Sequence, residues 1–416
     1  MPATQLRVAT VGSVDDGKST LLGRLLHDTT SIFEDQLAAL SRASRRYGDG
    51  DGLHLALLTD GLRAEREQGI TIDVAYRYFA TPRRSFVLAD TPGHAQYTRN
   101  MVTGASVSDV AIVLIDARHG VVEQTRRHLA IASLLRVGHV VVAVNKMDLV
   151  GWSQERFDEI LLDVAEALER FGERPAVQAV PVSALLGDNV VARSDAAPWY
   201  DGPPLLTILE DIDPVPPVPV GARIAVQWTI RAGDYRGYAG TLVGGPLRVG
   251  DPVVSALTGL RSTVVRIERN GERAEFAGSG DAVAVELADD LDVGRGDTLV
   301  VLDAPVAPVV TRSVVADVCW MVDRPLEPGS TYLAKHGTRT VRATVEAVVD
   351  RIDLDVLERR PVERLGLNDI GGIVLTLGSA IVADPYHVHR ETGHLVLVDE
   401  HTNATAGAAV LRSLGD

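Results

Sequence analysis

An eight-residue motif constrains the fold of this chain more than any other feature of the sequence. Residues 12–19 read GSVDDGKS and match the pattern G-x-x-x-x-G-K-[ST]. An apolar run at residues 7–11 precedes the motif, and residues 18–27 follow it with leucines on one helical face. A strand, a glycine-rich turn and a helix in this order bind phosphate, because backbone N–H groups and the helix N-terminus attract oxyanions. We therefore expect a nucleotide-binding α/β domain around this motif.

Strand-like and helix-like segments alternate through the first half of the chain. The strand-like segments are apolar and partly β-branched, and they cover residues 85–89, 110–115, 139–144 and 176–182. Helical patterns cover residues 94–106, 123–136 and 153–171. Strands that alternate with helices predict a mostly parallel sheet with helices on both faces.

The pattern changes after about residue 211. Residues 211–220 (DIDPVPPVPV) are rich in proline, as is typical of a semi-rigid linker. Short alternating apolar runs follow, separated by glycine-containing turns, and they predict antiparallel β-barrels. A second break occurs at residues 303–308 (DAPVAP). We therefore expect a P-loop α/β domain with a mostly parallel sheet at residues 1–212, followed by two antiparallel β-barrel domains at residues 221–304 and 308–416.

Composition excludes several classes of protein. The single cysteine, Cys319, excludes a disulfide framework and favours a reducing cytoplasm. The first residues lack the pattern of a signal peptide, and no run approaches about 18 apolar residues, so we expect no membrane span. Acidic residues outnumber basic ones by 56 to 41, for a formal charge of −15. This surplus argues against nucleic-acid binding, because phosphates need basic partners.

The glycine-rich motif assigns roles to individual side chains. Lys18 is expected to reach the β- and γ-phosphates of a nucleotide, and the Ser19 hydroxyl to bind Mg²⁺. The whole turn is expected to contact the nucleotide through Gly12, Ser13, Val14, Asp15, Asp16, Gly17, Lys18, Ser19 and Thr20.

A second motif, expected to contact the nucleotide, follows the strand-like residues 85–89 and consists of Asp90, Thr91, Pro92, Gly93 and His94. An acidic residue at the carboxyl end of a strand can hold Mg²⁺ through a water molecule, which is the role expected of Asp90. Gly93 has no side chain, so its N–H can approach the γ-phosphate. A plain turn after a strand is the alternative, which the preceding phosphate loop makes the weaker one.

A third motif selects the base. Asp148 ends the sequence Asn145-Lys146-Met147-Asp148 and can accept hydrogen bonds from guanine N1–H and its 2-amino group. Adenine lacks both donors and would leave the carboxylate unpaired, so the motif predicts GTP rather than ATP. The backbone of Ser183, Ala184 and Leu185, after residues 176–182, is expected to complete the base pocket.

The motifs in this order resemble those of translation-factor-class GTPases. Residues 69–72 (GITI) then resemble the first switch of that class, where Thr71 would bind Mg²⁺ and sense the γ-phosphate. The resemblance implies that His94 orients the attacking water, with Lys18 and Thr71 as the other catalytic residues. Val14 and Ile70 match the apolar pair of that class that screens the water. Packing or a helix-start hydrogen bond is the alternative role for His94.

Longer stretches resemble one family within this class, the large GTP-hydrolysing subunits of heterodimeric ATP sulfurylases (sulfate adenylyltransferase subunit 1, CysN). The resemblance runs from about residue 6 to the last residue and is carried by residues 12–20, 60–78, 90–106, 236–241, 368–371 and 384–405. It implies that GTP hydrolysis drives ATP and sulfate to adenosine 5′-phosphosulfate and pyrophosphate. It also implies a heterodimer or higher assembly, because adenylyl transfer would occur on a separate small PP-loop adenylyltransferase subunit (CysD-like). No second phosphate-binding loop occurs, so an adenylylsulfate kinase would be a separate protein.

Two other functions remain open from the sequence. A translation elongation factor that carries aminoacyl-tRNA is one, although the acidic charge and the variant first motif argue against it. A relative that binds GTP without hydrolysing it is the other. The sequence also departs from the family pattern, since Ala95 replaces a usual glutamate and His389 a usual asparagine. We expect His387, His389 and His394 to be surface residues rather than metal ligands.

Overall fold

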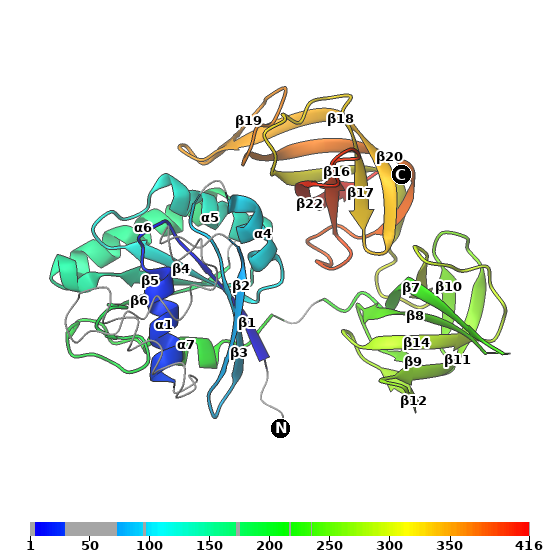
Figure 1. The fold of residues 1–416 in the computed structure, drawn as a ribbon, viewed down its shortest axis with the longest axis horizontal. Helices are drawn as coiled ribbons and strands as arrows, with labels where there is room; N and C mark the ends of the chain where they lie inside the picture. Colours follow the sequence, from blue (N-terminus) through cyan, green and yellow to red (C-terminus); the bar gives the residue numbers. More distant parts are fainter. Residues whose placement is uncertain are drawn as a thin grey trace. The chain divides into compact units, whose positions relative to one another are not determined.

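The computed structural model describes residues 5–29, 73–94, 97–171, 175–215, 218–233 and 235–415. The chain divides into two compact units (Figure 1). The first comprises Met1–Val215 and Asp353–Glu358, and the second comprises Pro216–Ile352 and Arg359–Asp416.

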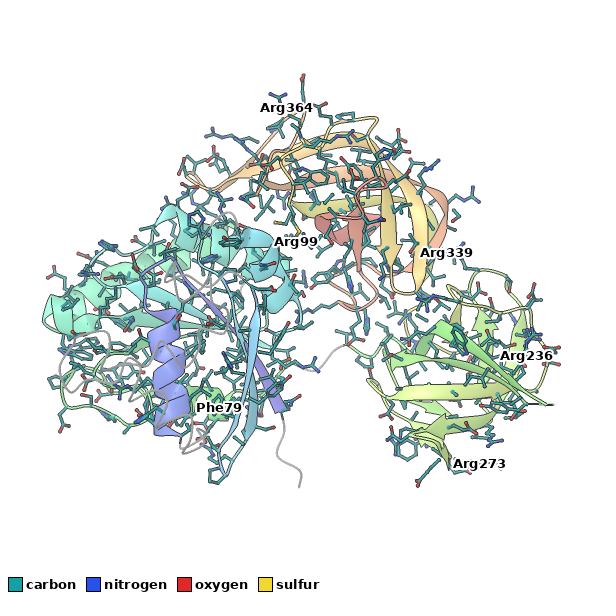
Figure 2. The ribbon with its side chains drawn as sticks, viewed as in Figure 1. Phe79, Arg99, Arg236, Arg273, Arg339 and Arg364 are labelled. Atoms are coloured by element: carbon teal, nitrogen blue, oxygen red, sulfur yellow. The ribbon has the colours of Figure 1, made fainter. Side chains whose placement is uncertain are left out.

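A six-stranded sheet forms the centre of the first unit, in the order β2-β3-β1-β4-β5-β6. The strands are β1 (Gln5–Val11), β2 (Ala75–Ala80), β3 (Ser85–Asp90), β4 (Val110–Asp116), β5 (His139–Asn145) and β6 (Ala176–Pro181). All neighbouring pairs are parallel except β2 with β3, which is antiparallel. Phe79 on β2, labelled in Figure 2, stacks on its register partner Phe86 with ring centroids 4.5 Å apart. This pairing attaches an edge strand that the sequence analysis did not predict.

Helices cover both faces of this sheet, with α4, α5 and α6 on one side and α1 and α7 on the other (Figure 1). Leucines of α1 and α7, among them Leu21 and Leu205, share a core with Ile112 of β4. The predicted α/β architecture is therefore confirmed. The helices in the described residues are α1 (Lys18–Asp28), α4 (Thr98–Ser106), α5 (Glu123–Leu134), α6 (Gln154–Arg170) and α7 (Leu205–Asp211), with a 3₁₀ turn, η3, at Met147–Val150.

The helix predicted over residues 123–136 ends at Leu134. Arg136 has a φ of 49°, a left-handed conformation that a helix cannot include. The helix predicted over residues 94–106 begins at Thr98, and residues 95–96, including Ala95, lie outside the described part of the chain. α7 was not predicted, because its short apolar pattern follows an irregular segment.

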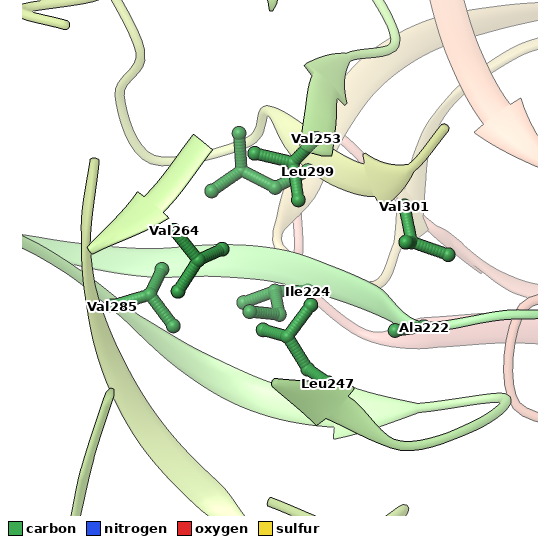
Figure 3. Close-up of a pocket in the computed structure, with 8 residues that line it drawn as sticks. All are labelled: Ala222, Ile224, Leu247, Val253, Val264, Val285, Leu299 and Val301. Carbon is green, nitrogen blue, oxygen red and sulfur yellow. The ribbon is translucent and has the colours of Figure 1, made fainter. Parts of the chain in front are cut away.

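The second unit begins with a closed antiparallel barrel, the first barrel, in the order β10-β15-β7-β8-β14-β11, with β10 pairing back to β11. Eight small or branched apolar side chains, among them Ile224, Val285 and Leu299, line a small cavity within its apolar core (Figure 3). The strands are β7 (Arg223–Ala232), β8 (Tyr235–Val243), β10 (Pro252–Ser255), β11 (Arg261–Arg269), β14 (Ala282–Leu287) and β15 (Thr298–Val301). Shorter strands are β9 (Leu247–Arg248), β12 (Glu272–Ala274) and β13 (Phe276–Ala277).

A second barrel follows in the order β17-β21-β22-β16-β20-β18, with β17 pairing to β18. Trp320 lies in its core, edge-on to Tyr332 at 5.3 Å, and the neighbouring Cys319 is buried as expected. The two predicted antiparallel barrels are thus confirmed. The strands are β16 (Val309–Trp320), β17 (Thr331–His336), β18 (Arg339–Asp353), β19 (Glu358–Arg360), β20 (Ile370–Ala383), β21 (His394–Val398) and β22 (Thr405–Leu414).

One of the three histidines predicted at the surface is buried. His389 is only 3% exposed and contacts the Thr392 hydroxyl at 3.0 Å through Nδ1, whereas His387 and His394 are exposed. The prediction for His389 was wrong because the segment between β20 and β21 turns inward instead of continuing as a strand. Burial lowers the pKa of His389, although Glu391 and Asp384 oppose the shift.

Candidate nucleotide-binding site

The strand order of the first unit brings the sequence motifs to one edge of the sheet. β1 leads into the glycine-rich loop, β3 ends at Asp90, and β5 ends at Asn145. Thr10 is the register partner of Asp90, and Asp116 is the register partner of Asn145. Ligands of open α/β sheets bind at this carboxyl edge. Ser183 follows β6 at the same edge, so the described motif residues all gather at one site.

Glycine at position 17 is required by both conformation and space. Gly17 has a φ of 93°, which disfavours any side chain, and it directly precedes the first residue of α1, Lys18. A Cβ at this position would lie 2.5 Å from the Asn145 side-chain nitrogen. The loop therefore packs directly against the third motif.

Lys18 is held across the loop by the backbone. Its Nζ donates to the carbonyl oxygens of Gly12 and Ser13, each at 2.8 Å, and the residue is 7% exposed. Burial lowers the pKa of Lys18, while the nearby carboxylates of Asp90 and Asp16 oppose that shift. The ammonium group is thus fixed where phosphates are expected.

Asp16 introduces a negative group into the same loop. Its carboxylate accepts a hydrogen bond from the Ser13 N–H, and the residue is 6% exposed. Burial raises the pKa of Asp16, with Lys18 opposing the shift. The carboxylate therefore occupies a backbone donor of the kind that a phosphate uses. This contact was not predicted from the sequence.

The second motif packs on the first. A Cβ at Gly93 would lie 2.4 Å from Lys18 Nζ and 2.5 Å from the Gly12 carbonyl oxygen, so only glycine fits there. Asp90 is 1% exposed, and the Thr10 hydroxyl lies 3.3 Å from its Oδ1. Thr91 and Pro92 are also buried, and the Thr91 hydroxyl donates to the Thr10 carbonyl oxygen at 2.6 Å.

His94 lies at the exposed end of this motif. Its ring meets the Tyr97 ring edge-on, with centroids 6.2 Å apart, and its carbonyl oxygen accepts from the Tyr97 N–H at 2.9 Å. The helix-start contact that the sequence analysis left open for His94 is therefore present. It involves the backbone carbonyl group of His94 rather than its imidazole.

Asn145 connects three parts of the site. Its side-chain Nδ2 donates to the Asp16 carbonyl oxygen at 2.7 Å, and its Oδ1 accepts from the Ala184 N–H at 2.9 Å. Met147 is fully buried and donates through its N–H to Val182 at 3.2 Å. The amide of Asn145 thus ties the phosphate loop to the segment after β6. Asp148 lies half-exposed in η3 beside it.

Three residues of the site were missed by the sequence analysis. Arg24 of α1 donates through Nε to the Ala184 carbonyl oxygen at 3.3 Å and through a second nitrogen to that of Leu185. Asp116, at the end of β4, contacts Lys146 and Arg118. Asp116 could have been identified from the sequence, because it is an acidic residue at the end of the strand beside β5. Nothing local in the sequence marks Arg24 or Arg118.

Thr71 and Ile70, predicted for the first switch, lie outside the described residues. Within the described ranges, no group of three or more His, Cys, Asp or Glu side chains is arranged to hold a metal ion. Ser19 is half-buried at the start of α1, where its hydroxyl is the expected ligand. None of the described helices is both long and apolar enough to cross a membrane.

Comparisons with known proteins agree with this geometry. Residues 4–218 match the family described as "Elongation factor Tu GTP binding domain", and residues 313–412 match "GTP-eEF1A C-terminal domain-like". A protein of Methylorubrum populi named sulfate adenylyltransferase subunit 1 is 50% identical over 98% of this chain and 87% of its own length. A protein of the same name from Aeromonas salmonicida is 51% identical over 98% of this chain, and one from Salmonella paratyphi C is 49% identical over 99% of it. Each match covers 86% of the relative's own length. The chain therefore belongs to the sulfate adenylyltransferase subunit 1 family, and its residues 4–218 belong to the family of elongation factor Tu GTP-binding domains.

Proposed function

We propose that this chain is the GTP-hydrolysing subunit of a sulfate adenylyltransferase. Its GTP hydrolysis drives ATP and sulfate to adenosine 5′-phosphosulfate and pyrophosphate. One observation carries the proposal: identity of about half to sulfate adenylyltransferase subunit 1 proteins extends over 98% of the chain, both barrels included. A GTPase domain shared with translation factors would not by itself extend the likeness so far. For the same reason we do not favour an aminoacyl-tRNA carrier.

Guanine nucleotide binding follows from the contacts at the sheet edge. The loop N–H groups and Lys18 would hold the phosphates, and Asp148 would accept two hydrogen bonds from guanine. The Ser183–Leu185 backbone would close the base pocket, since Asn145 and Arg24 already hold it in place. The phosphate-binding end and the base-binding end of the site are thus linked by hydrogen bonds within the protein itself.

Mg²⁺ is the proposed cofactor, and the residues present fit its chemistry. The Ser19 hydroxyl and the Asp90 carboxylate are hard oxygen donors, which Mg²⁺ prefers, and Asp90 is buried beside the Thr10 hydroxyl. Thr71, from the first switch, would add a third oxygen. The ion would neutralise charge on the β- and γ-phosphate oxygens.

Hydrolysis would use His94, Lys18 and Thr71. The exposed imidazole of His94, at the end of a motif that packs on Lys18, would orient the attacking water. Lys18 would stabilise charge on the transferred phosphoryl group, and Val14 with Ile70 would screen the water. Hydrolysis would then release the switch segments.

A second subunit is needed, as the shared name "subunit 1" implies. We propose a small PP-loop adenylyltransferase (CysD-like) that binds ATP and sulfate in the cytoplasm. The mixed anhydride that it makes is much less stable than its precursors, so coupling to GTP hydrolysis gives a useful yield. The product would pass to a separate adenylylsulfate kinase.

The test is a coupled assay with the purified full chain. GTP turnover and adenosine 5′-phosphosulfate formation are measured with and without the small subunit, ATP and sulfate. We expect turnover to rise on adding all three, and Lys18→Ala to abolish both signals while Lys335→Ala, in the second barrel, leaves them unchanged. GTP turnover that does not respond to the partner and its substrates would contradict the proposal. Tight, GTP-dependent retention of aminoacyl-tRNA on a filter would favour the elongation-factor alternative instead.

A further inference from the structure

We propose that Asp116 is a positioning residue for guanine nucleotides and acts by holding Lys146 between the base-binding loop and the phosphate loop. This inference rests on the proposed nucleotide site. It concerns a carboxylate that lies in none of the recognised motifs and ends the strand adjacent to the third motif.

The pairing of β4 with β5 sets the position of Asp116. β4 and β5 run parallel, and Asp116 is the register partner of Asn145, so Asp116 lies beside the residue that precedes Lys146. Asp116 is 2% exposed, and its Oδ2 lies 2.9 Å from Lys146 Nζ. A buried carboxylate requires such a partner, because an unpaired charge in the interior is strongly unfavourable.

Lys146 also contacts the phosphate loop. The same Nζ donates to the carbonyl oxygen of Asp15, in the middle of the phosphate loop. Lys146 and Asp15 both have left-handed backbones, with φ values of 62° and 68°. Such conformations are strained for residues other than glycine and persist where surrounding contacts hold them. One ammonium group therefore joins two strained turns from opposite sides of the site.

Asp116 is itself held in place by Arg118. Its Oδ1 accepts from the Arg118 N–H at 2.9 Å and from Arg118 Nε at 3.0 Å, and its Oδ2 lies 2.6 Å from Arg118 Nη2. Burial alone would raise the pKa of Asp116, but hydrogen bonds from Arg118 and Lys146 outweigh it and hold that pKa well below its usual range. The carboxylate stays ionised at working pH and keeps one fixed orientation.

Loss of the Asp116 charge would therefore free Lys146 without touching Lys18, Asp90 or His94. The Asp15 turn and the Lys146 turn would then relax, and bound nucleotide would leave faster. Binding would suffer more than the chemical step, since the residues around the γ-phosphate keep their contacts.

A cycle of variants in the full chain tests whether Asp116 acts through Lys146. The release rate of a fluorescent GDP derivative is measured for Asp116→Asn, Lys146→Met and the double variant. We expect each single change to speed release about tenfold or more, and the double variant to match Lys146→Met alone, because contacting residues are not additive. Multiplied effects in the double variant, or no effect of Asp116→Asn, would overturn the inference.

Two further measurements separate positioning from general destabilisation. Asp116→Asn should raise the KM for GTP by a larger factor than it lowers kcat, whereas a folding defect lowers the active fraction and leaves KM unchanged. Asp163→Asn, an exposed change on α6, serves as the matched control and should leave GDP release unchanged. If the unsubstituted chain does not bind GDP, the proposed nucleotide site fails. If it binds and the cycle is multiplicative, only the role of Asp116 fails.

Discussion

Arg223 and Asp384 form an ion pair in which each side chain is only 1% exposed. Arg223 Nη2 lies 2.9 Å from Asp384 Oδ1 and also donates to the Val306 carbonyl oxygen at 2.9 Å. The other oxygen of Asp384 accepts from the Thr392 hydroxyl at 2.6 Å. Arg223 begins β7 of the first barrel, and Asp384 directly follows β20 of the second, so the pair joins the two barrels of one unit.

Removing one partner of this pair should destabilise the second unit. Arg223→Met leaves the Asp384 carboxylate buried without its cation, and we expect a loss of about 3 to 5 kcal/mol in the free energy of unfolding. Urea unfolding of the full chain measures the change. Arg342→Met, which breaks the exposed pair with Glu400, is the control and should cost less than about 1 kcal/mol.

Replacing both partners distinguishes a buried charge from lost packing. Arg223→Met combined with Asp384→Leu removes both charges, and we expect it to recover much of the stability lost in Arg223→Met alone. A double variant as unstable as the sum of its parts would show that the pair contributes through shape rather than charge.

Base selection should depend on Asp148. Asp148→Asn replaces an acceptor by an amide that can donate to the C2 carbonyl oxygen of xanthine. We expect the affinity for GDP to fall about a hundredfold or more while that for xanthosine diphosphate rises. Competition with fluorescent GDP gives both constants. Asp158→Asn, on the exposed face of α6, should change neither, and equal losses for both bases would contradict the assignment.

Turnover should depend on His94 more than binding does. His94→Ala removes the imidazole that we place beside the attacking water, and we expect a fall of about 10²- to 10⁴-fold in GTP turnover. Affinity for GDP should stay within about twofold, since we place the imidazole beside the γ-phosphate, which GDP lacks. His401→Ala, on an exposed turn of the second barrel, is the matched control. Unchanged turnover in His94→Ala would favour a relative that binds GTP without hydrolysing it.

Acid should destabilise the first unit through His128. This residue is 1% exposed on α5, and burial, followed by the charges of Lys18 and Arg127, lowers its pKa from 6.5 to about 3. Between these values the unfolded chain binds a proton that the folded chain does not, so stability falls as pH falls through that window. The slope from this one group approaches about 1.4 kcal/mol per pH unit.

Calorimetric unfolding of His128→Gln across that window tests the effect. The melting temperature of the variant should fall less steeply with acid than that of the unsubstituted chain. His119→Gln changes an exposed histidine, 64% of whose side chain is accessible, and should not alter the slope. Parallel slopes for all three proteins would exclude His128 as the cause.

The sequence predicted the fold well because its signals are local. Period, turn residues and apolar runs identified β1, α1, β4 and β5 within a few residues, and the start of α1 at Lys18 matched its motif. Because the motifs follow parallel strands, they gather at one edge of the sheet. The edge strand β2 was missed because its pairing depends on Phe79 stacking on Phe86, a contact that neither segment reveals alone.

Two contacts of the site that could not be predicted join residues distant in sequence. Arg24 reaches Ala184 across 160 positions, and Asp116 meets Lys146 only because two strands run in register. Asp16 was assigned to the nucleotide loop, but its hydrogen bond to the Ser13 N–H depends on the path of the turn. His389 was placed at the surface because burial of an irregular segment leaves no periodic signal.

The amide of Asn145 has a consequence for how the first unit opens. Its two hydrogen bonds, to the Asp16 carbonyl oxygen and from the Ala184 N–H, couple the two segments through one side chain. The phosphate loop and the segment after β6 should therefore exchange their amide hydrogens with one shared protection level, as a single cooperative opening unit. Asn145→Ala would split that unit into two, each with its own exchange rate.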